Sequence, residues 1–530
     1  MSTVKQIYES DKGKEIVEKS KKGFFHVVFG RMGIIVLLLL LQVGILFALF
    51  GWLQEYVIYA YSSLWLLSAI TVIWIINQPS NPGFKLAWMV PITLIPVFGI
   101  LFYIFIETQV GTRVMNRLLD ASSKKIDKYA VQNHDVYEEI RKDDPQMGNL
   151  AKYLADCAGF PAFRNAGVEY FPLGEDKFKV LVKELKNAKK FIFMEYFIVA
   201  EGRMWNTILD ILKEKVKEGV EVRFMYDGTC SVSLLPFNYA RELEESGIKC
   251  KVFNQIKPAL STTQNNRDHR KITVIDGKVG FTGGVNLADE YINEKERFGH
   301  WKDTAIMVRG EAVRNFTWMF LQLWDIDVKN EDYEKYLNVK QEQFTYAMPG
   351  YVIPYGDSPL DNENVGELVY MDIINTASEY VHIMTPYLIL DNEMITALTY
   401  AAKRGIDVKI IMPGIPDKAY AFALAKTYYP ELIKAGVKIY QYEPGFVHAK
   451  VFTSDHKKAV VGTINMDYRS LYLHFECAVL LYKVREIDRI EKDFQDTLKQ
   501  CREITMGEYK KEKVFTRFYG RVLRLIAPLM

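Results

Sequence analysis

Two stretches of the chain repeat one polar pattern, His-x-Lys-x4-Asp-x6-Gly-x-x-Asn, with no change in spacing. Alternate side chains of a β-strand share a face, so a strand at each copy would hold the imidazole beside the lysine ammonium group. The glycine allows close approach of the backbone, and the asparagine adds an amide donor. The polar members are His269, Lys271, Asp276 and Asn286 in the first copy, and His448, Lys450, Asp455 and Asn465 in the second.

This duplicated pattern predicts a single site for a phosphodiester group. If the two copies pack about a pseudo-twofold axis, the lysines and asparagines would spread the negative charge of the equatorial oxygens. One histidine, neutral, would attack phosphorus, while the other, protonated, would deliver a proton to the leaving alcohol. No carboxylate cluster suited to Mg²⁺ or Ca²⁺ accompanies the motif, and the five cysteines show no zinc-binding spacing. We therefore expect a site without metal or cofactor.

The elements that must position these residues follow an α/β order that occurs twice. Short β-rich runs alternate with longer amphipathic stretches, and glycines mark the start of equivalent strands in both halves. We predict two similar lobes, each a mixed sheet flanked by helices. The predicted strand, helix and strand are 191–198, 204–219 and 220–226 in the first half, and 380–384, 392–405 and 406–411 in the second.

The boundaries of the lobes follow from composition. The first lobe is predicted at 146–335 and the second at 345–503, with a polar linker at Asp332–Gly350 and an extra loop in the first lobe at about Asn254–Asp268. The remaining stretch, 504–530, is basic and has apolar residues at spacings of three to four. It predicts an amphipathic helix that either lies on an anionic lipid surface or packs on the core of the enzyme itself.

The first hundred residues have a different composition from the rest. The chain carries 67 basic and 65 acidic residues among 530, which excludes a disordered chain and gives no global nucleic-acid signature. Its mean hydropathy of −0.05 averages over a charged part and a segment, 31–107, that is almost free of charge. Three apolar runs in that segment are each long enough to cross a membrane: Gly33–Leu53, Tyr56–Ile76 and roughly Lys85–Ile106.

The membrane topology stays open at this point, with two or three full spans. The stretch before the first run carries seven Lys and Arg residues, six in the tail at 1–30 and Arg31 after it, which places the tail in the cytoplasm by the positive-inside rule. Three spans would put the rest of the chain outside, although basic residues also follow the third run. Pro91 and Pro96 allow a kinked or re-entrant third segment, which would put both basic regions on the same side.

These residues resemble the phospholipase D superfamily, and more closely its bacterial cardiolipin synthases, over nearly the whole chain. The resemblance rests on the two motifs and on further blocks of sequence. Those blocks are Asn81–Trp88, Leu94–Tyr103, His300–Thr304, Thr385–Tyr387, Lys403–Val408, Tyr442–Lys450, Asp467–Ser470 and Phe475–Glu476. It implies two phospholipase-D-like lobes around a shared active site, in a multi-pass protein of the bacterial cell membrane. The chain departs from the usual pattern in its additional first apolar run, and in Thr463 where serine is common.

The resemblance also implies a reaction, in which two phosphatidylglycerol molecules give cardiolipin and glycerol through a phosphatidyl-histidine intermediate. His269 would be the nucleophile and His448 the acid and base. Phosphate ligands would be Lys271, Lys450, Asn286 and Asn465; Asp276 and Asp455 would support the motif; Asp303 and Glu476 would each orient a histidine. Four other histidines match no ligand spacing and are predicted to be structural: His26, His134, His382 and His474.

Several alternative functions share these residues. Water as the acceptor would make the enzyme a phospholipase D-type hydrolase or a membrane-tethered nuclease, although no basic stripe with interleaved aromatic residues favours nucleic acid. Serine or ethanolamine as the acceptor would make it a different phosphatidyltransferase. A catalytically dead membrane scaffold is disfavoured by two intact motifs. The order of the two histidines, the membrane face of the site and the oligomeric state are not predicted.

Overall fold

A computed structural model of the chain describes residues 31–51, 56–107, 110–230, 234–236, 238–254, 265–327, 331–341, 348–361 and 363–529. The chain divides into two compact units. The described part of the smaller, N-terminal unit runs to residue 113, and the larger unit runs from Val114 to Pro528 apart from residues 256–264. Two predicted features lie outside the described residues, namely the basic tail at 1–30 and most of the extra loop at about 254–268.

The third apolar run of the N-terminal unit forms two helices instead of one. It breaks at Ile95, and Pro96 starts the next helix because proline cannot continue the preceding hydrogen-bond ladder. A Cβ atom on Gly99 would lie 2.5 Å from the carbonyl oxygen of Pro91, so glycine permits a tight helical hairpin here. The helices of this unit are α3 (Arg31–Gly51), α4 (Val57–Ile76), α5 (Pro82–Leu94) and α6 (Pro96–Glu107).

A small aromatic and aliphatic core joins these helices. The ring of Tyr103 meets that of Trp88 edge-on at 5.3 Å and that of Trp74 at 5.7 Å. The hydroxyl of Ser68 in α4 donates to the carbonyl oxygen of Ile92 in α5 at 3.3 Å. Counting only residues that the structure describes, none of the helices is long and apolar enough to cross a membrane.

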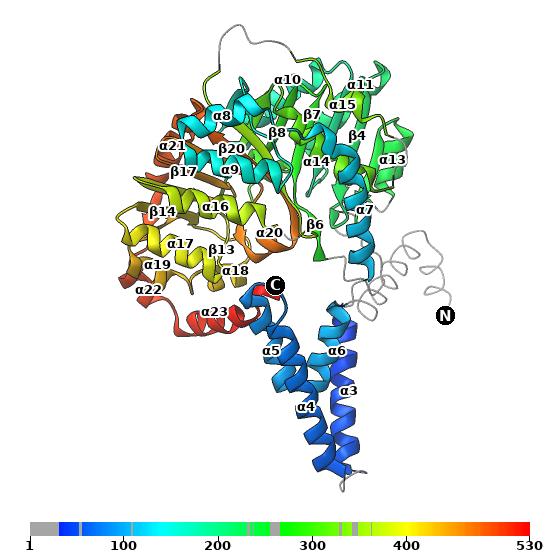
Figure 1. Ribbon diagram of the computed structural model, residues 1–530, viewed down its shortest axis with the longest axis vertical. Helices are drawn as coiled ribbons and strands as arrows, with labels where there is room; N and C mark the ends of the chain where they lie inside the picture. The colour runs from blue at the N-terminus through cyan, green and yellow to red at the C-terminus, as the bar shows by residue number, and fades with distance from the viewer. Residues whose placement is uncertain are drawn as a thin grey trace, which may run out of the picture. The chain divides into compact units, whose positions relative to one another are not determined.

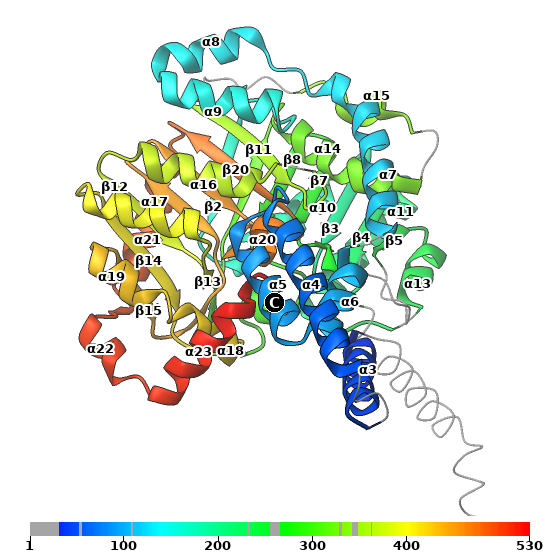
Figure 2. The same cartoon turned by 60° about the horizontal axis from the view of Figure 1, so that its bottom comes forward.

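The larger unit contains two sheets that repeat one strand order. The first sheet runs β2-β10-β8-β7-β3-β4-β5, and the second contains β11-β20-β18-β17-β12-β14-β15 as its equivalent. In both, the last three strands are parallel and the others are antiparallel. The predicted duplication into two α/β lobes is confirmed, and Figures 1 and 2 show the lobes side by side, the first largely green and the second yellow to red.

The strands of the first sheet are β2 (Gly167–Phe171), β3 (Phe191–Tyr196), β4 (Glu221–Asp227), β5 (Lys249–Phe253), β7 (Lys271–Ile275), β8 (Val279–Gly283) and β10 (Ala305–Arg309). Those of the second are β11 (Tyr351–Asp357), β12 (Tyr380–Met384), β14 (Asp407–Pro413), β15 (Lys438–Tyr442), β17 (Val451–Ser454), β18 (Lys458–Gly462) and β20 (His474–Tyr482), with β1 (Phe163–Arg164) and β21 (Cys501–Glu503) at its edges. Short strands elsewhere are β6 (Arg267–Asp268), β9 (His300–Lys302), β13 (Leu388–Ile389), β16 (Gly445–Val447) and β19 (Met466–Asp467).

Helices cover both faces of the first sheet. Every residue of β3 is buried, and its side chains alternate between the two faces. Ile192 and Met194 join the core formed with α10 and α11, while Phe193 stacks on Phe320 of α14 at 4.7 Å. The longer helices of this unit are α7 (Val110–Ile126), α8 (His134–Asp143), α9 (Pro145–Asp156), α10 (Gly174–Asn187), α11 (Arg203–Lys217), α14 (Val313–Trp324), α16 (Val365–Thr376), α17 (Asn392–Lys403), α21 (Glu486–Leu498) and α23 (Val514–Ile526).

The glycines that mark the repeat occupy equivalent helix-to-strand turns. Gly219 and Gly405 follow α11 and α17 with φ of +86° and +93°, and Gly247 and Gly436 have φ of +83° and +106°. This left-handed conformation is open to glycine without a steric penalty, which is why all four equivalent turns use it. Shorter helices complete the lobes: α13 (Tyr239–Glu245), α15 (Tyr333–Leu337), α18 (Ala419–Ala425), α19 (Tyr429–Ala435), α20 (Tyr468–Tyr472) and α22 (Met506–Lys511).

Two short strands pair across the lobes. Strand β6 of the first lobe runs parallel to the start of β20 in the second, with Phe475 opposite Asp268. Strand β16 of the second lobe runs parallel to β9 of the first, with Val447 opposite Lys302. Each of these short strands leads directly into a motif histidine, so the two motifs start where the lobes meet.

The predicted linker at Asp332–Gly350 is in part a structured element of the first lobe. Helix α15 lies inside it, and the ring of its Tyr336 meets that of Phe191 edge-on at 5.1 Å. Polar composition concealed this helix because its buried residues, among them Leu337, are few and close together in sequence.

The C-terminal stretch forms two helices, α22 and α23. A Cβ atom on Gly520 would lie 2.4 Å from the carbonyl oxygen of Ala423, so α23 packs tightly against α18. Leu523 is buried in the same contact, whereas Phe515 and Phe518 are 75% and 63% exposed. One side of α23 therefore packs on the enzyme, and its other side carries exposed apolar residues.

Candidate active site

His269 lies between β6 and β7, and not inside a strand as predicted. Its backbone N–H donates to the carbonyl oxygen of Phe475 at 2.9 Å. Its Nδ1 lies 2.8 and 3.0 Å from the two carboxylate oxygens of Glu476, the next residue along β20. The pairing of β6 with β20 thus places the histidine of the first lobe against a carboxylate of the second.

His448 repeats this arrangement with the lobes exchanged. Its backbone N–H donates to the carbonyl oxygen of Lys302 at 2.7 Å, and its Nδ1 lies 2.7 Å from Oδ2 of Asp303. Sequence reasoning named Asp303 and Glu476 as orienting carboxylates but did not say which histidine each would serve. A carboxylate on Nδ1 fixes the tautomer, so that Nε2 carries the lone pair.

The two motif lysines are held beside their histidines. Lys271 opens β7, and Lys450 immediately precedes β17. The Nζ of each donates to the backbone carbonyl oxygen of the histidine two residues earlier. Both lysines are only 1% exposed, so their charge acts in a site from which water is largely excluded.

The two motif asparagines line the pocket that contains both histidines, but they have different partners. Oδ1 of Asn286 accepts from the backbone N–H of Ile198 at 2.9 Å, and its Nδ2 donates to the hydroxyl of Tyr291 at 2.9 Å. Oδ1 of Asn465 is buried, and no hydrogen-bond partner for it is found among the described residues. Asn286 is therefore fixed by the fold, while a hydroxyl of a bound ligand could donate to Oδ1 of Asn465.

The residue that follows the motif glycine differs between the two lobes. In each lobe it fits the carboxylate that lies beside it. A Cβ atom on Gly284 would lie 2.0 Å from Oδ1 of Asp303, so only glycine leaves room for that carboxylate. The equivalent residue, Thr463, instead donates its hydroxyl to Glu476. The hydroxyl that the sequence retains at Thr463 thus has a definite partner.

Asp276 and Asp455, which the family resemblance predicted to support the motif, lie away from the histidines. The carboxylate of Asp276 accepts from the backbone N–H groups of Lys190 and Phe191 at 2.6 and 2.9 Å, beyond the end of β7 farthest from His269. Five residues of strand span about 17 Å, too far for contact with a shared phosphate. Asp455 binds the backbone of residues 378–380 in the same way. Each aspartate thus anchors the turn that precedes the neighbouring strand, β3 for Asp276 and β12 for Asp455.

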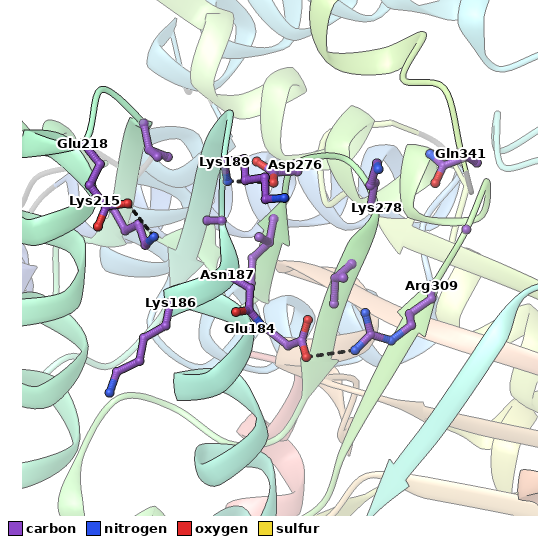
Figure 3. A pocket seen from close by; sticks show the side chains of 15 residues that line it. Glu184, Lys186, Asn187, Lys189, Lys215, Glu218, Asp276, Lys278, Arg309 and Gln341 are labelled. Atoms are coloured by element: carbon purple, nitrogen blue, oxygen red, sulfur yellow. Dashed lines mark hydrogen bonds and ion pairs between the residues drawn. The ribbon is translucent and has the colours of Figure 1, made fainter. Parts of the chain in front are cut away.

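Figure 3 shows the surroundings of Asp276, a hollow of about 710 Å³. Arg309 pairs there with Glu184 at 2.9 Å, and Lys215 pairs with Glu218 at 2.7 Å. None of the motif histidines, lysines or asparagines lines it. Its size alone therefore does not make it the functional site.

The pocket that contains both histidines has a volume of about 510 Å³. Its walls carry the two motif asparagines and several further cationic side chains, with apolar rings on the remaining sides. A pocket of this size holds a small polar group rather than long acyl chains. The further lining residues with basic side chains are Arg267, Arg297, Lys418, Arg469 and His474.

Burial governs the protonation of the site. Burial and the nearby Lys271 hold the pKa of His269 well below its ordinary value. Burial and Lys450 lower the pKa of His448 to about 4, against the opposing effect of Asp303. Burial lowers the pKa of Lys271 to about 8 and that of Lys450 to about 7. At pH 7 both imidazoles are neutral before an anion binds, and the lysines are only partly charged.

We predict that binding of a phosphate-like anion takes up protons. An anion stabilises the charged forms of Lys271 and Lys450 and so raises both pKa values. The lysines are already charged below pH 6, so proton uptake should increase, and affinity should fall, as the pH rises through 7 and 8. Titration calorimetry with tungstate at pH 8, in buffers of different ionisation enthalpy, should show uptake of about one proton. A binding enthalpy that is independent of the buffer would contradict this prediction.

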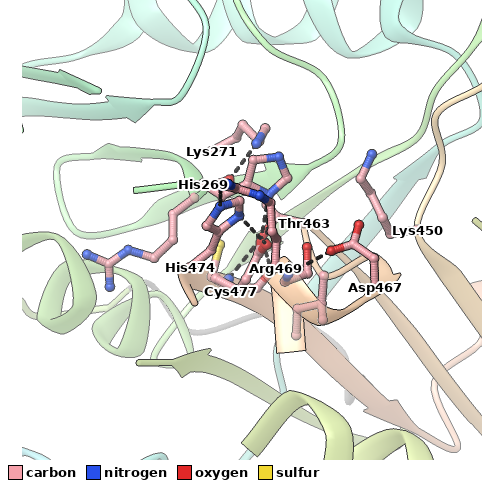
Figure 4. Close-up of polar contacts among 12 residues, drawn as sticks. His269, Lys271, Lys450, Thr463, Asp467, Arg469, His474 and Cys477 are labelled. Carbon is pink, nitrogen blue, oxygen red and sulfur yellow. Dashed lines mark hydrogen bonds and ion pairs between the residues drawn. The ribbon is translucent and has the colours of Figure 1, made fainter. Parts of the chain in front are cut away.

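His474 belongs to the pocket, although sequence reasoning left it as structural. Its ring lies beside that of His269 (Figure 4), with the two centroids 5.4 Å apart, and its Nδ1 lies 3.8 Å from Oε1 of Glu476. It lies outside both motif copies, so spacing gave no signal for it. Among the described residues, His269, His474 and Glu476 form a group whose possible metal-ligand atoms lie within 4.8 Å of one another. The expectation of a metal-free site therefore stays a prediction.

Comparison with known proteins now decides the family. Residues 181–324 and 370–498 match the family described as "Cardiolipin synthase, PLD-like domain". A "Cardiolipin synthase" of Alkalihalophilus pseudofirmus is 34% identical over 491 residues, covering 91% of this chain and 96% of that protein. The chain belongs to the cardiolipin synthase family. Its two phospholipase-D-like domains confirm the predicted fold, and each matched segment contains one complete motif.

Three further similarities were found for this member of the cardiolipin synthase family. Residues 64–107 match the family described as "Phospholipase_D-nuclease N-terminal". An "Uncharacterized protein" of Streptococcus mutans serotype c is 53% identical over 87% of this chain and 99% of that protein. The crystal structure of a phosphatidylserine synthase of Haemophilus influenzae Rd KW20 has a TM-score of 0.55 and 15% identity, covering 73% of this chain and 98% of that one. This last likeness concerns the fold alone.

Proposed function

We propose that the enzyme transfers a phosphatidyl group from one phosphatidylglycerol molecule to another, giving cardiolipin and glycerol. The observation that carries the proposal is one pocket holding two histidines, each paired through Nδ1 with a carboxylate of the opposite lobe. Membership of the cardiolipin synthase family supplies the substrate class. The lysines and asparagines of both motifs suit the phosphodiester of the donor lipid.

In the first half of the proposed reaction, Nε2 of His269 attacks phosphorus in line. The bond between phosphorus and the oxygen of the glycerol headgroup breaks as the phosphorus–nitrogen bond forms. His448, protonated once the anionic donor has raised its pKa, gives its proton to the departing glycerol oxygen. Lys271 and Lys450 stabilise the negative charge that gathers on the equatorial oxygens.

In the second half, the terminal hydroxyl of another phosphatidylglycerol takes the place of glycerol. Neutral His448 accepts the hydroxyl proton while the oxygen attacks phosphorus. The phosphorus–nitrogen bond breaks, and its electron pair returns to His269. The products are cardiolipin and an enzyme in its starting protonation state.

The roles of nucleophile and of acid and base are assigned from the difference in pKa between the two imidazoles. The pKa of His269 is held lower than its ordinary value by burial and by several nearby cations, which favours the neutral nucleophile. Asp303 opposes the same effects at His448, so this imidazole accepts a proton more readily. His269 therefore suits the nucleophile, and His448 suits the acid and base.

A direct assay tests the proposed reaction against its alternatives. Purified protein in mixed micelles with radiolabelled phosphatidylglycerol and EDTA should give cardiolipin and glycerol in equal amounts. Phosphatidic acid as the sole lipid product would indicate a hydrolase with water as the acceptor. Added serine or ethanolamine, if consumed in preference to phosphatidylglycerol, would indicate a different transferase. Loss of turnover with EDTA that zinc or magnesium restores would overturn the metal-free mechanism.

We further propose that the N-terminal unit is embedded in the bacterial cell membrane. The sequence of the first two apolar runs supports this, as do outward-facing side chains such as Phe47 and Ile58, which are 76% and 75% exposed. Helix α5 has 13 residues and extends about 20 Å, less than a hydrocarbon core of about 30 Å. If the first two apolar runs cross the membrane as their sequences predict, a re-entrant α5–α6 hairpin would keep both basic regions and the active site in the cytoplasm.

The exposed side of α23 is proposed to rest on the same membrane. Arg517 and Arg521 accompany its exposed apolar residues, a composition that favours an anionic lipid surface. Ala527, just beyond the helix, lines the active-site pocket. Docking of α23 would therefore bring the mouth of the pocket close to the lipid headgroups.

We predict that Phe515→Ser together with Phe518→Ser lowers turnover of phosphatidylglycerol in vesicles about fivefold or more. Both side chains are largely exposed, so folding should be little affected. Turnover of short-chain phosphatidylglycerol below its micelle concentration should stay within twofold of wild type. Tyr400→Ser, which removes an exposed aromatic side chain from α17, serves as the matched control. An equal loss on both substrates would show that α23 acts on the fold instead of on the membrane.

A further inference from the structure

An ion pair joins the two lobes behind the strand that holds His448. Nζ of Lys302, in β9 of the first lobe, lies 2.9 and 2.7 Å from the two carboxylate oxygens of Asp493, in α21 of the second lobe. It also donates to the backbone carbonyl oxygen of Pro172 at 2.6 Å. The hydroxyl of Tyr170 donates to the same carboxylate at 2.7 Å. Neither Lys302 nor Asp493 lines the pocket that contains the two histidines.

This ion pair is largely shielded from water. The side chains of Lys302 and Asp493 are 5% and 13% exposed, and Tyr170 is fully buried. A buried ion pair needs further hydrogen bonds to offset the lost hydration of its charges, and Tyr170 and Pro172 supply them here. Removing one partner would leave the other charge buried and unpaired, which disturbs a structure far more than the loss of an exposed pair. The ion pair therefore fixes β9 of the first lobe against the second lobe.

The backbone at Lys302 and the residue after it form both contacts that hold His448 in place. The carbonyl oxygen of Lys302 accepts from the backbone N–H of His448 at 2.7 Å, and Asp303 binds Nδ1 of that histidine at 2.7 Å. Successive side chains of an extended segment point to opposite sides, so the ammonium group of Lys302 lies on the side away from this histidine. A shift of the segment would move the backbone acceptor and the orienting carboxylate of His448 together.

The equivalent position in the other half of the site carries an apolar side chain. Phe475 corresponds to Lys302, because its carbonyl oxygen accepts from the backbone N–H of His269 and the orienting carboxylate follows it. Its buried ring meets that of Phe253 in the first lobe edge-on at 5.5 Å. Apolar packing thus holds the strand beside the nucleophile, whereas an ion pair holds the strand beside His448. Loss of the ion pair should therefore act on one histidine more than on the other.

We propose that Lys302 and Asp493 are positioning residues for His448. Their ion pair across the lobes holds the carboxylate of Asp303 against Nδ1, and so keeps Nε2 aligned with the leaving glycerol and with the incoming hydroxyl. The inference rests on the proposed transferase function and deepens it. It predicts that loss of the ion pair slows proton transfer by His448 more than attack on phosphorus by His269.

The test compares a reaction that needs a proton from His448 with one that does not. Turnover of phosphatidylglycerol needs that proton, whereas release of 4-nitrophenol from its phosphatidyl ester needs only attack by His269, because nitrophenolate leaves without a proton. For Lys302→Met we expect phosphatidylglycerol turnover to fall at least tenfold, while the rate of the nitrophenol burst stays within threefold of wild type. Asp493→Asn should give the same pattern, and it carries the comparison if Lys302→Met does not fold. Lys302→Arg, which keeps the charge, should retain part of the turnover.

Controls separate positioning from a general loss of structure. Lys499→Met breaks an exposed ion pair with Asp496 at the end of α21 and should leave both rates unchanged. Because Glu476 reaches His269 from the other lobe, separation of the lobes would slow the burst as well. A loss of both rates by the same factor, or no loss of either, would overturn the inference. A wild type that made phosphatidic acid instead of cardiolipin would refute the proposed function and leave this comparison of rates intact.

Discussion

Replacing either His269 or His448 with alanine should abolish cardiolipin formation, with a loss in turnover of about 10⁴-fold or more. Each imidazole forms or breaks a bond to a reacting atom, and no other histidine of the described pocket has a carboxylate within hydrogen-bond distance of its Nδ1. Turnover should be measured with labelled phosphatidylglycerol on protein whose folding has been checked by thermal unfolding. Near-normal turnover of either variant would refute the two-histidine mechanism.

The two variants should differ with an activated donor. A phosphatidyl ester of 4-nitrophenol has a leaving group that needs no proton, so His448→Ala should still release nitrophenol in a burst equal to the enzyme concentration. His269→Ala should show no burst because it lacks the nucleophile. The reverse pattern would exchange the roles of the two histidines while leaving the shared site intact.

The second large effect is expected at the orienting carboxylates. Glu476→Gln and Asp303→Asn keep the shape of each side chain but remove the carboxyl group that is hydrogen-bonded to Nδ1, and each should lower turnover by about 10² to 10⁴-fold. Glu476→Gln should disturb the titration of His269, which lies in the other lobe, and leave that of His448 unchanged. Asp303→Asn should do the opposite. Nitrogen-15 spectra of the labelled imidazoles would report each histidine separately.

The motif aspartates provide a matched control for these variants. Asp276→Asn and Asp455→Asn make the same chemical change at carboxylates that bind backbone N–H groups at the far ends of their strands. They should lower the melting temperature and leave the turnover of folded enzyme close to that of wild type. If they instead reduced turnover as strongly as Glu476→Gln, the structural role of these aspartates would be wrong.

Local features of the sequence predicted most of the fold. The apolar run at 191–198 and the helical period at 204–219 became β3 and α11, because burial of a strand and of one helix face depends on nearby residues. The repeated glycines at Gly219 and Gly405 fixed equivalent turns for a local steric reason. The helix inside the predicted linker was missed because its buried residues are few.

The partners of the catalytic residues could not be predicted in the same way. His269 and Glu476 are 207 residues apart, and His448 and Asp303 are 145 residues apart. Their contacts depend on how β6 pairs with β20 and β16 with β9, which no periodicity records. The pairing of β6 with β20 also places His474 beside His269 in the pocket. Motif spacing also could not show that the aspartates lie at the other end of each strand from the histidines.

The stereochemical course at phosphorus tests the central claim most directly, namely that one site uses two histidines for two successive displacements. The donor would be phosphatidylglycerol with sulfur in place of one non-bridging oxygen, prepared as a single diastereomer at phosphorus. Each in-line displacement inverts phosphorus, so attack by His269 followed by attack of the acceptor hydroxyl predicts thio-cardiolipin with overall retention. Inversion would mean that the acceptor attacks the donor directly, without a covalent histidine intermediate, and would contradict the mechanism.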